Sequence, residues 1–481
     1  MTQLEAVMWV LDSDPRLASA FANLTLLDRV PDRDVLRARM LRAAAAVPRL
    51  RQRVVESGHL STPAWQEDPE FDIDHHIRWI DVGTDDVDDL AAALSGRPFD
   101  RERPLWEFVV IEGLPGGTAA MVQRFDHTLT DGEGGIRLSV QFLDLERHPA
   151  ATDPAPDADE MVGDAPPARR PASSDLASSD PAASDLADEP DAAVERTGLL
   201  GHATRGLQAA VAVPATVARG AARVPQGAGS LVELARDSMQ QLAVDSRRSP
   251  LWTERSTDRW FGRSAVNLED VKAAAHDLGG SVNDLFVTGA LAAAAQVHRA
   301  ADLPVDELRV AIPVSNRSSG DGGGNAFTPI HALLPAGEMS VQERFSVVHE
   351  RLTRVKQEGA IRLDGPAAAA RLLPSSALLG IVGRTAGTID FVCSNVRAAP
   401  FDLFMAGAHL EGNYPLGPLL NTSFNLTTMS YRGWLFLGLL VDRAAVPDPH
   451  GLLEALDEAY SDVLAAGGVT ERRRPDLRLP V

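Results

Sequence analysis

The chain has 481 residues, of which 44% are hydrophobic and 23% are charged, and its formal net charge is −21. This length predicts two or three structural units, and the negative charge argues against nucleic acid as a partner and against a polybasic membrane anchor. The single cysteine, Cys393, excludes an internal disulfide, and the sequence shows neither a signal pattern nor an apolar stretch of ~18–20 residues, so we expect a cytoplasmic location.

Residues 1–146 alternate between helical and strand patterns. Apolar residues at helical spacing predict a helix over 35–43, which ends before Pro48. The alternating run over 120–125 predicts a strand, and a glycine-rich helix from Gly134 follows it. The first part of the chain is therefore predicted to form an α/β lobe.

The composition changes over residues 147–197, which are rich in Ala, Pro, Ser and Asp. Residues 151–200 contain 12 acidic and 3 basic residues, and such a segment buries too little apolar surface to offset the entropy cost of ordering it. We therefore expect a flexible acidic linker between an N-terminal lobe, 1–146, and a C-terminal lobe, 198–481.

The C-terminal part begins with alanine-rich amphipathic helices over 199–244. Their arginines could contact a membrane surface, but covering the protein's own core is the interpretation that we favour. Further helical patterns occupy 281–297, 341–356 and 452–464, and strand patterns occupy 308–314 and 433–441. This mixture predicts a second α/β lobe.

One short motif indicates chemistry: Asp126-His127-Thr128-Leu129-Thr130-Asp131-Gly132 lies between a predicted strand and a predicted helix. A histidine at the end of a strand, followed by a glycine-containing turn, can point its imidazole into a cleft. The ordinary pKa of histidine, roughly 6.5, lets it take and return a proton near neutral pH. Taken alone, the motif also fits a capping or buried histidine.

Several other segments accompany this motif. They are Pro104-Leu105-Trp106, Asn283-Asp284, Pro313-Val314-Ser315-Asn316-Arg317 and Ser394-Asn395-Val396. In their order and spacing the chain resembles the bacterial wax ester synthase/diacylglycerol acyltransferase family, whose signature is His-His-x-x-x-Asp-Gly. The resemblance covers almost the whole chain apart from the linker. It departs at Asp126, which replaces the first histidine, and at residues 397–400, where the family has a Pro-Gly-Pro loop.

The resemblance implies both a fold and a reaction. The fold is α/β and two-lobed, like that of the CoA-dependent acyltransferases (chloramphenicol acetyltransferase among them) and of condensation domains, with the active site between the lobes. The reaction is transfer of a fatty acyl group from acyl-CoA to a hydroxylated lipid, with diacylglycerol the favoured acceptor and a long-chain alcohol next. Acyl-CoA is a substrate, and we expect no separate cofactor and no metal. Peripheral contact with a membrane or a lipid droplet is compatible with this function.

The resemblance also assigns roles to individual residues. His127 is expected to act as the general base, because an alcohol does not ionise at neutral pH and must lose its proton during attack. Asp131 either pairs with Arg317 and braces the turn, which we favour, or orients His127 directly. Gly132 is expected to permit the backbone geometry of the turn. The oxyanion could be bound by backbone N–H groups at the start of the following helix or by the amide of Asn283.

Three further features are given structural interpretations. His75-His76 indicate packing rather than a metal site, because no further His or Cys lies at ligand spacing. Trp106 is expected to pack in the core or between the lobes rather than to contact a substrate. Cys393 lies in an apolar run and is expected to be buried and inert.

Two alternatives to lipid acylation stay open. The first is a condensation-type reaction that takes the acyl group from a carrier protein. The second is a catalytically silent lipid-binding homologue, which Asp126 and the altered loop at 397–400 would explain. The sequence does not distinguish acceptor, acyl chain length or oligomeric state.

Overall fold

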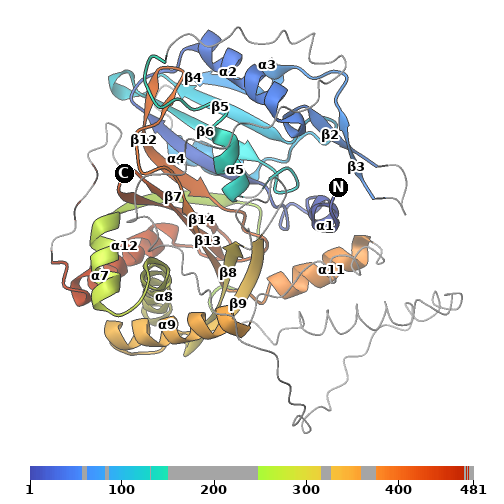
Figure 1. The fold of residues 1–481 in the computed structure, drawn as a ribbon. Coiled ribbons are helices and arrows are strands. Elements are labelled where there is room, and N and C mark those ends of the chain that lie inside the picture. Colours follow the sequence, from blue (N-terminus) through green and yellow to red (C-terminus); the bar gives the residue numbers. More distant parts are fainter. Residues whose placement is uncertain are drawn as a thin grey trace, which may run out of the picture.

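The computed structural model describes residues 1–56, 62–81, 86–130, 132–149, 248–315, 327–358 and 375–470, together with Arg473 and Pro475. These residues form two lobes, each built on a six-stranded sheet and flanked by helices (Figure 1). The expected two-lobed α/β architecture is thereby confirmed. The expected linker over 147–197 lies outside the described residues from residue 150 onward, as do the expected helices over 199–244.

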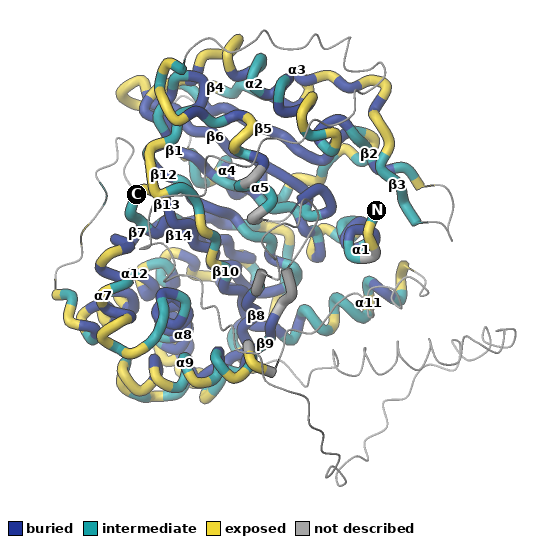
Figure 2. Tube along the Cα trace, viewed as in Figure 1, coloured by how far each residue is buried: buried dark blue, intermediate teal, exposed yellow. Residues whose placement is uncertain are grey.

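The sheet of the N-terminal lobe has the strand order β11-β12-β1-β6-β5-β4. Its strands are β1 (Phe21–Leu27), β4 (Ile77–Asp81), β5 (Trp106–Glu112), β6 (Ala119–Phe125), β11 (Phe404–Met405) and β12 (Ala408–Leu416). Every residue of β6 is buried, because β6 lies inside the sheet and both of its faces are covered (Figure 2). A close-packed strand of this kind holds the residues that follow it in a defined position.

Helices pack on this sheet from two sides. α2 (Arg33–Ala46) and α3 (Ile73–His76) lie over its upper side in Figure 1, whereas α4 (Val87–Gly96) packs against β6 and against β7 (Arg259–Asn267) of the other lobe. α2 begins after Asp32, whose side chain accepts a hydrogen bond from the backbone N–H of Val35. The other elements of this lobe are α1 (Gln3–Leu11), β2 (Gln52–Val55), β3 (Ala64–Glu67) and α5 (Gly132–Ser139).

Two strands of the N-terminal sheet come from the C-terminal part of the chain. β12 pairs antiparallel with β1, and β11 pairs with β12. The expected division into 1–146 and 198–481 assigns residues 404–416 to the C-terminal lobe, whereas the structure places them in the sheet of the N-terminal lobe. The two halves of the chain therefore build this sheet together.

The sheet of the C-terminal lobe has the order β7-β14-β13-β10-β8-β9. Its other strands are β8 (Glu307–Ser315), β9 (Phe327–Pro335), β10 (Phe391–Arg397), β13 (Phe424–Tyr431) and β14 (Trp434–Asp442). Four helices gather on one side of it (Figure 1): α7 (Leu268–Asp277), α8 (Val282–Ala300), α9 (Val341–Glu358) and α12 (Pro449–Ala466). α11 (Ser375–Ala386) lies apart from them, nearer to α1.

The helices and strands that the sequence predicts within the described residues are confirmed. They are α2, β6, α5, α8, β8, α9, β14 and α12. Within the described ranges, no single helix combines the length and apolarity that crossing a membrane requires, and only α7 and α8, joined at a bend of 92°, reach that standard as a pair. Most residues of α8 are buried among the neighbouring helices and strands, as in the core of a folded domain.

The two lobes meet closely where β12 passes β14. A Cβ on Gly438 of β14 would stand 1.8 Å from the carbonyl oxygen of Pro415 in β12, so only glycine allows this approach. Buried side chains of the C-terminal lobe, including Phe261 and Phe436, join the apolar cluster of the N-terminal sheet. The relative position of the lobes is therefore fixed by shared packing.

Candidate active site

The turn between β6 and α5 carries the histidine of the motif. The backbone N–H of Asp126 donates to the carbonyl of Leu105 at 3.0 Å, which continues the pairing of β6 with the start of β5. The side chain of Asp126 then accepts hydrogen bonds from the backbone N–H of Thr128 at 2.8 Å and from its hydroxyl at 2.6 Å. This local capping is typical of aspartate in turns, and the buried Asp126 thus shapes the turn that presents His127.

The imidazole of His127 is held by the backbone of Ser19, which lies two residues before β1. Its Nδ1 lies 2.5 Å from the carbonyl oxygen of Ser19, and the ring meets the edge of Phe21 with the ring centroids 4.6 Å apart. A carbonyl oxygen only accepts, so Nδ1 carries a hydrogen and donates it. In the neutral imidazole, Nε2 is then the nitrogen whose lone pair can accept a proton.

The position of Ser19 follows from the pairing of β1 with β6. These strands are antiparallel, with Phe21 opposite Phe125. Continuing this register by two residues beyond each strand places Ser19 opposite His127. Asp12, the residue that ends α1, fixes Ser19 in turn, because its Oδ1 accepts from the backbone N–H of Ser19 at 2.6 Å and from its hydroxyl at 3.0 Å.

The Pro-Leu-Trp segment lies beside this turn. Leu105 supplies the carbonyl that Asp126 binds, and Trp106 is buried in the core as expected, with its indole N–H donating to the carbonyl of Leu50. His76 stacks on Trp106 at 4.5 Å between ring centroids, and its Nδ1 donates to the backbone carbonyl of Trp106. Burial lowers the pKa of His76 to about 4. His76 is thus a neutral packing residue.

The structure describes only some of the other expected site residues. Asp131 and Arg317 lie outside the described residues, so their pairing stays a prediction. Gly132, the last residue of the motif, is also the first residue of α5, so the N-terminus of this helix lies at the end of the motif. Asn283 lies in the first turn of α8 in the C-terminal lobe, and the described contacts do not bring it to His127.

Two segments of the resemblance meet across the lobes. α5, which follows the histidine turn, contacts β10, the strand that contains Ser394-Asn395-Val396. Cys393 in the same strand is fully buried, and burial raises the pKa of its thiol far above its usual range. The thiol is therefore inert as a nucleophile, as the sequence predicts.

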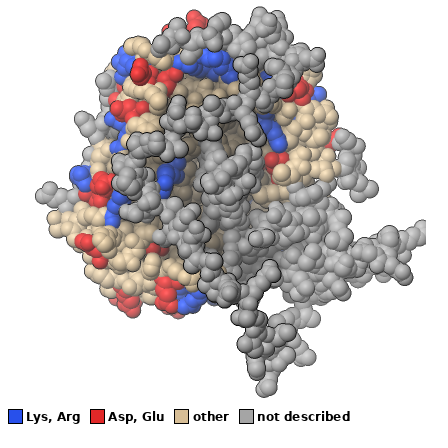
Figure 3. Space-filling view, viewed as in Figure 1, with Lys and Arg blue, Asp and Glu red and all other residues tan. Residues whose placement is uncertain are grey.

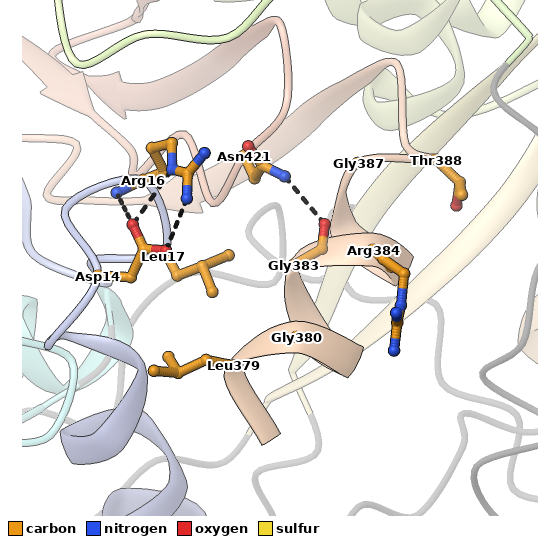
Figure 4. Close-up of a pocket in the computed structure, with 10 residues that line it drawn as sticks. All are labelled: Asp14, Arg16, Leu17, Leu379, Gly380, Gly383, Arg384, Gly387, Thr388 and Asn421. Carbon is orange, nitrogen blue, oxygen red and sulfur yellow. Dashed lines mark hydrogen bonds and ion pairs between the residues drawn. The ribbon is translucent and has the colours of Figure 1, made fainter. Parts of the chain in front are cut away.

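A cavity opens between the lobes next to the loop that carries Ser19. Its volume is about 520 Å³, and Figure 4 shows the loop residues on one side and helix α11 on the other. The lining residues are Asp14, Arg16, Leu17, Leu379, Gly380, Gly383, Arg384, Gly387, Thr388 and Asn421. Leu17 is two residues from Ser19, so one short loop contacts both the cavity and His127.

Sequence reasoning did not identify Asp12, Ser19 or Phe21 as site residues. None of them belongs to a motif, and each reaches His127 through a strand pairing that spans about a hundred residues of chain. The pairing of residues 21–27 with the strand over 119–125 could have revealed Ser19. Fixing its register would have placed Ser19 at His127.

Solved structures share this architecture. A wax ester synthase/diacylglycerol acyltransferase from Marinobacter aquaeolei VT8 matches with a TM-score of 0.63 at 21% identity, over 97% of this chain and 98% of that one. The first condensation domain of the CDA synthetase matches with a TM-score of 0.54 at 15% identity, over 98% of each chain. The fold is therefore the two-lobed fold that acyltransferases and condensation domains share.

Comparisons of sequence narrow this class to one family. A model of the wax ester synthase/diacylglycerol acyltransferase catalytic domain matches residues 1–286, and a model of the WS/DGAT C-terminal domain matches residues 323–463. A Mycobacterium tuberculosis protein that carries the name of a diacylglycerol O-acyltransferase is 32% identical over 472 residues, covering 96% of this chain and 91% of that protein. Another, named tgs1, is 26% identical over 97% of this chain and 95% of that protein. The chain belongs to the wax ester synthase/diacylglycerol acyltransferase family.

Proposed function

We propose that the protein transfers a fatty acyl group from acyl-CoA to the hydroxyl of a lipid, with Nε2 of His127 as the general base. The observation that carries this proposal is the hydrogen bond from Nδ1 of His127 to the carbonyl of Ser19. It selects the tautomer in which Nε2 can accept a proton. The half-buried imidazole lies on a turn that follows a buried strand of the sheet. A general base must meet its substrate in one orientation, and this rigid support provides that orientation.

The reaction needs one proton carrier and no covalent enzyme intermediate. Nε2 removes the hydroxyl proton while the oxygen attacks the thioester carbon, which forms the new C–O bond. The C–S bond then breaks, and the imidazolium returns the proton to the CoA thiolate. General base catalysis of this kind typically contributes ~10²–10⁴-fold. Backbone N–H groups at the start of α5 are the donors that we propose for the developing oxyanion.

The acceptor that we propose is diacylglycerol, with a long-chain alcohol as the second acceptor. Relatives carry the name of diacylglycerol O-acyltransferases, and the matching domain model is named for both reactions. Purified protein incubated with radiolabelled palmitoyl-CoA should convert diolein to labelled triacylglycerol, and hexadecanol to labelled wax ester more slowly. Labelled ester formed only from an acyl carrier protein donor would identify a condensation-type enzyme instead. No transfer from either donor would indicate a lipid-binding homologue.

The cavity between the lobes is the approach that we propose for the acyl chain. Leu17 and Leu379 supply apolar walls, and Gly380 and Gly383 of α11 contribute no side chains. Arg384 lies along the same helix, where a cation could meet the phosphates of CoA. The cavity therefore offers a route along which an acyl chain and its charged carrier could approach the histidine turn.

Filling this cavity should discriminate between long and short acyl chains. A Cβ on Gly380 would meet no atom within 4 Å, so Gly380→Phe should fold normally while its ring occupies the cavity. We expect kcat/KM to fall several-fold more for palmitoyl-CoA than for butyryl-CoA, with Gly380→Ala as the control that leaves both unchanged. Equal losses for the two donors, or none, would remove the cavity from the acyl route.

Contact with a lipid surface is a further part of the proposal. Exposed apolar side chains lie after α5 and before β11, namely Val140, Leu145 and Phe401. The bridge between Asp144 and Phe404 brings these two segments together. On the face shown in Figure 3, basic and acidic side chains of the described residues are interspersed over the N-terminal lobe. The peripheral contact that we propose uses the exposed apolar side chains of these two segments.

A further inference from the structure

Asp12 makes contacts that a surface helix cap would not need. One carboxylate oxygen, Oδ1, takes both the backbone N–H and the hydroxyl of Ser19, and the carbonyl of the same serine binds His127. The two hydrogen bonds to Asp12 fix the position of Ser19. The carbonyl of Ser19, fixed in this way, then orients the imidazole of His127 through the third hydrogen bond. The chain of contacts from Asp12 to His127 thus contains a single intervening residue.

The other oxygen of Asp12 has an unusual environment. Oδ2 is buried and accepts no hydrogen bond from any N–H or O–H donor among the residues that the structure describes. The side chain of Asp12 also lies within hydrogen-bonding reach of the carboxyl group of Asp126. Two carboxylates cannot share a hydrogen bond unless one of them carries a proton. One proton between Asp12 and Asp126 would give the buried Oδ2 of Asp12 a hydrogen-bond partner.

We propose that Asp12 and Asp126 form a carboxylic acid–carboxylate pair that shares one proton and that, through Ser19, fixes the orientation and tautomer of His127. Both residues are positioning residues, because neither touches the reacting atoms. Asp126 acts on the turn after β6 through Thr128, and Asp12 acts on the opposite strand through Ser19. The shared proton thus links the turn that carries His127 to the segment that carries Ser19. This inference rests on the proposed role of His127 as the base.

The charges around the pair favour one ionised carboxylate. Arg101 acts on both Asp12 and Asp126, and it is held by the carbonyl of Trp9 and by Glu56. Arg124 acts on Asp126 from β6 and is itself paired with Glu107. Each of these two cations is already engaged by a glutamate, so among the described residues they do not compensate two further negative charges. A second negative charge at the pair would lie buried beside the first.

The direction of the pKa shift agrees with this geometry. Burial and then the charge of Asp126 raise the pKa of Asp12 well above its usual range, although two hydrogen bonds from Ser19 oppose the shift. The folded protein therefore keeps this proton at pH values where an unfolded chain loses it. The stabilising contribution is complete below the ordinary carboxyl range and is lost as pH rises toward the raised value.

The test compares two replacements of Asp12. Asp12→Asn keeps an oxygen for Ser19 and supplies an N–H₂ donor to Asp126, so it imitates the protonated acid. Asp12→Ala removes both. We expect Asp12→Asn to retain most of the kcat and Asp12→Ala to lose ~10-fold or more, with the KM for acyl-CoA unchanged in each. The melting temperature of Asp12→Asn relative to wild type should rise between pH 4 and 8, because only the wild type loses a shared proton.

The chain offers a matched control in the C-terminal lobe. Asp442 also accepts both the backbone N–H and the hydroxyl of one serine, Ser256, at 2.7 and 2.6 Å. Asp442→Ala should lower the melting temperature but leave kcat and its pH profile unchanged. Histidine ¹⁵N NMR supplies a readout that stability does not move: His127 should carry its proton on Nδ1 in the wild type, in Asp12→Asn and in Asp442→Ala, and lose this preference in Asp12→Ala.

The outcomes separate this inference from the proposed function. If His127→Ala keeps its turnover, His127 is not the base, and the proposed function fails whatever Asp12 does. If His127→Ala is inactive but Asp12→Ala keeps the wild-type kcat and tautomer, only the present inference is overturned. Equal losses in Asp12→Asn and Asp12→Ala would overturn the shared proton. The double variant of Asp12 and His127 should be no slower than His127→Ala alone, because Asp12 acts through the histidine.

Discussion

Replacing His127 with alanine should lower kcat by ~10²-fold or more while the protein stays folded. The hydroxyl acceptor then loses the group that takes its proton, and the CoA thiolate loses the group that returns it. The side chain of His127 is only half-buried, so we expect its removal to lower the melting temperature modestly. Initial rates with palmitoyl-CoA and diolein measure the effect, and a melting curve confirms the fold.

The pH dependence of the same reaction distinguishes a base from a binding group. In the wild type, kcat should rise with pH as the imidazole loses its proton, because only the neutral form can accept one. In His127→Ala the remaining rate should lack this rise. Turnover close to that of the wild type, or an unchanged profile in the variant, would exclude His127 as the proton acceptor.

Replacing Glu107 with glutamine should lower the free energy of unfolding by about 3–5 kcal/mol, because it leaves a buried arginine without its counter-charge. Arg124 is 1% exposed, and its Nη1 lies 2.6 Å from Oε2 of Glu107. The other carboxylate oxygen of Glu107 binds Arg78 at 3.0 Å. Urea denaturation at pH 7 measures the loss. The matched control is Glu112→Gln at the far end of β5, where the partner Arg33 is largely exposed and the loss should be about 1 kcal/mol or less.

The same pair predicts how stability changes with pH. Burial alone would raise the pKa of Glu107, but the hydrogen bond from Arg78 and the charge of Arg124 outweigh it, so the pKa is lowered from its ordinary 4.5. The folded state therefore binds this proton less tightly than the unfolded chain. The stabilisation is present above pH 4.5 and is lost as the pH falls through the lowered value. In Glu107→Gln this acid-sensitive part should be missing, and equal acid sensitivity in both proteins would contradict the pairing.

Local patterns predicted the elements that depend on local sequence. α8 and α9 carry apolar residues at helical spacing, and β6 contains an alternating run before a turn, so each element could be predicted from its own residues. The histidine turn was predicted from a strand followed by a glycine-containing turn, whereas the hydrogen bond from Thr128 to Asp126 came only from the structure.

Features that depend on strand pairing were not accessible in this way. β12 adds to the edge of β1, and Ser19 meets His127, only because strands distant in sequence adopt one particular register. The low-complexity linker also suggested that each half of the chain folds into its own lobe. A composition poor in apolar residues predicts a linker, but it does not predict which sheet a later strand will join.

The exchanged strand has a consequence for how the protein can be divided. A cut anywhere between residues 149 and 248 would leave one fragment with β1 as an unpaired sheet edge and the other with β12 as a strand without a sheet. Unpaired edges of this kind recruit other strands and promote aggregation. The sheet of the N-terminal lobe would be complete again only when the fragments reassociate and β12 pairs once more with β1. The protein is thus a natural candidate for a split enzyme, in which activity reports that two separately made halves have met.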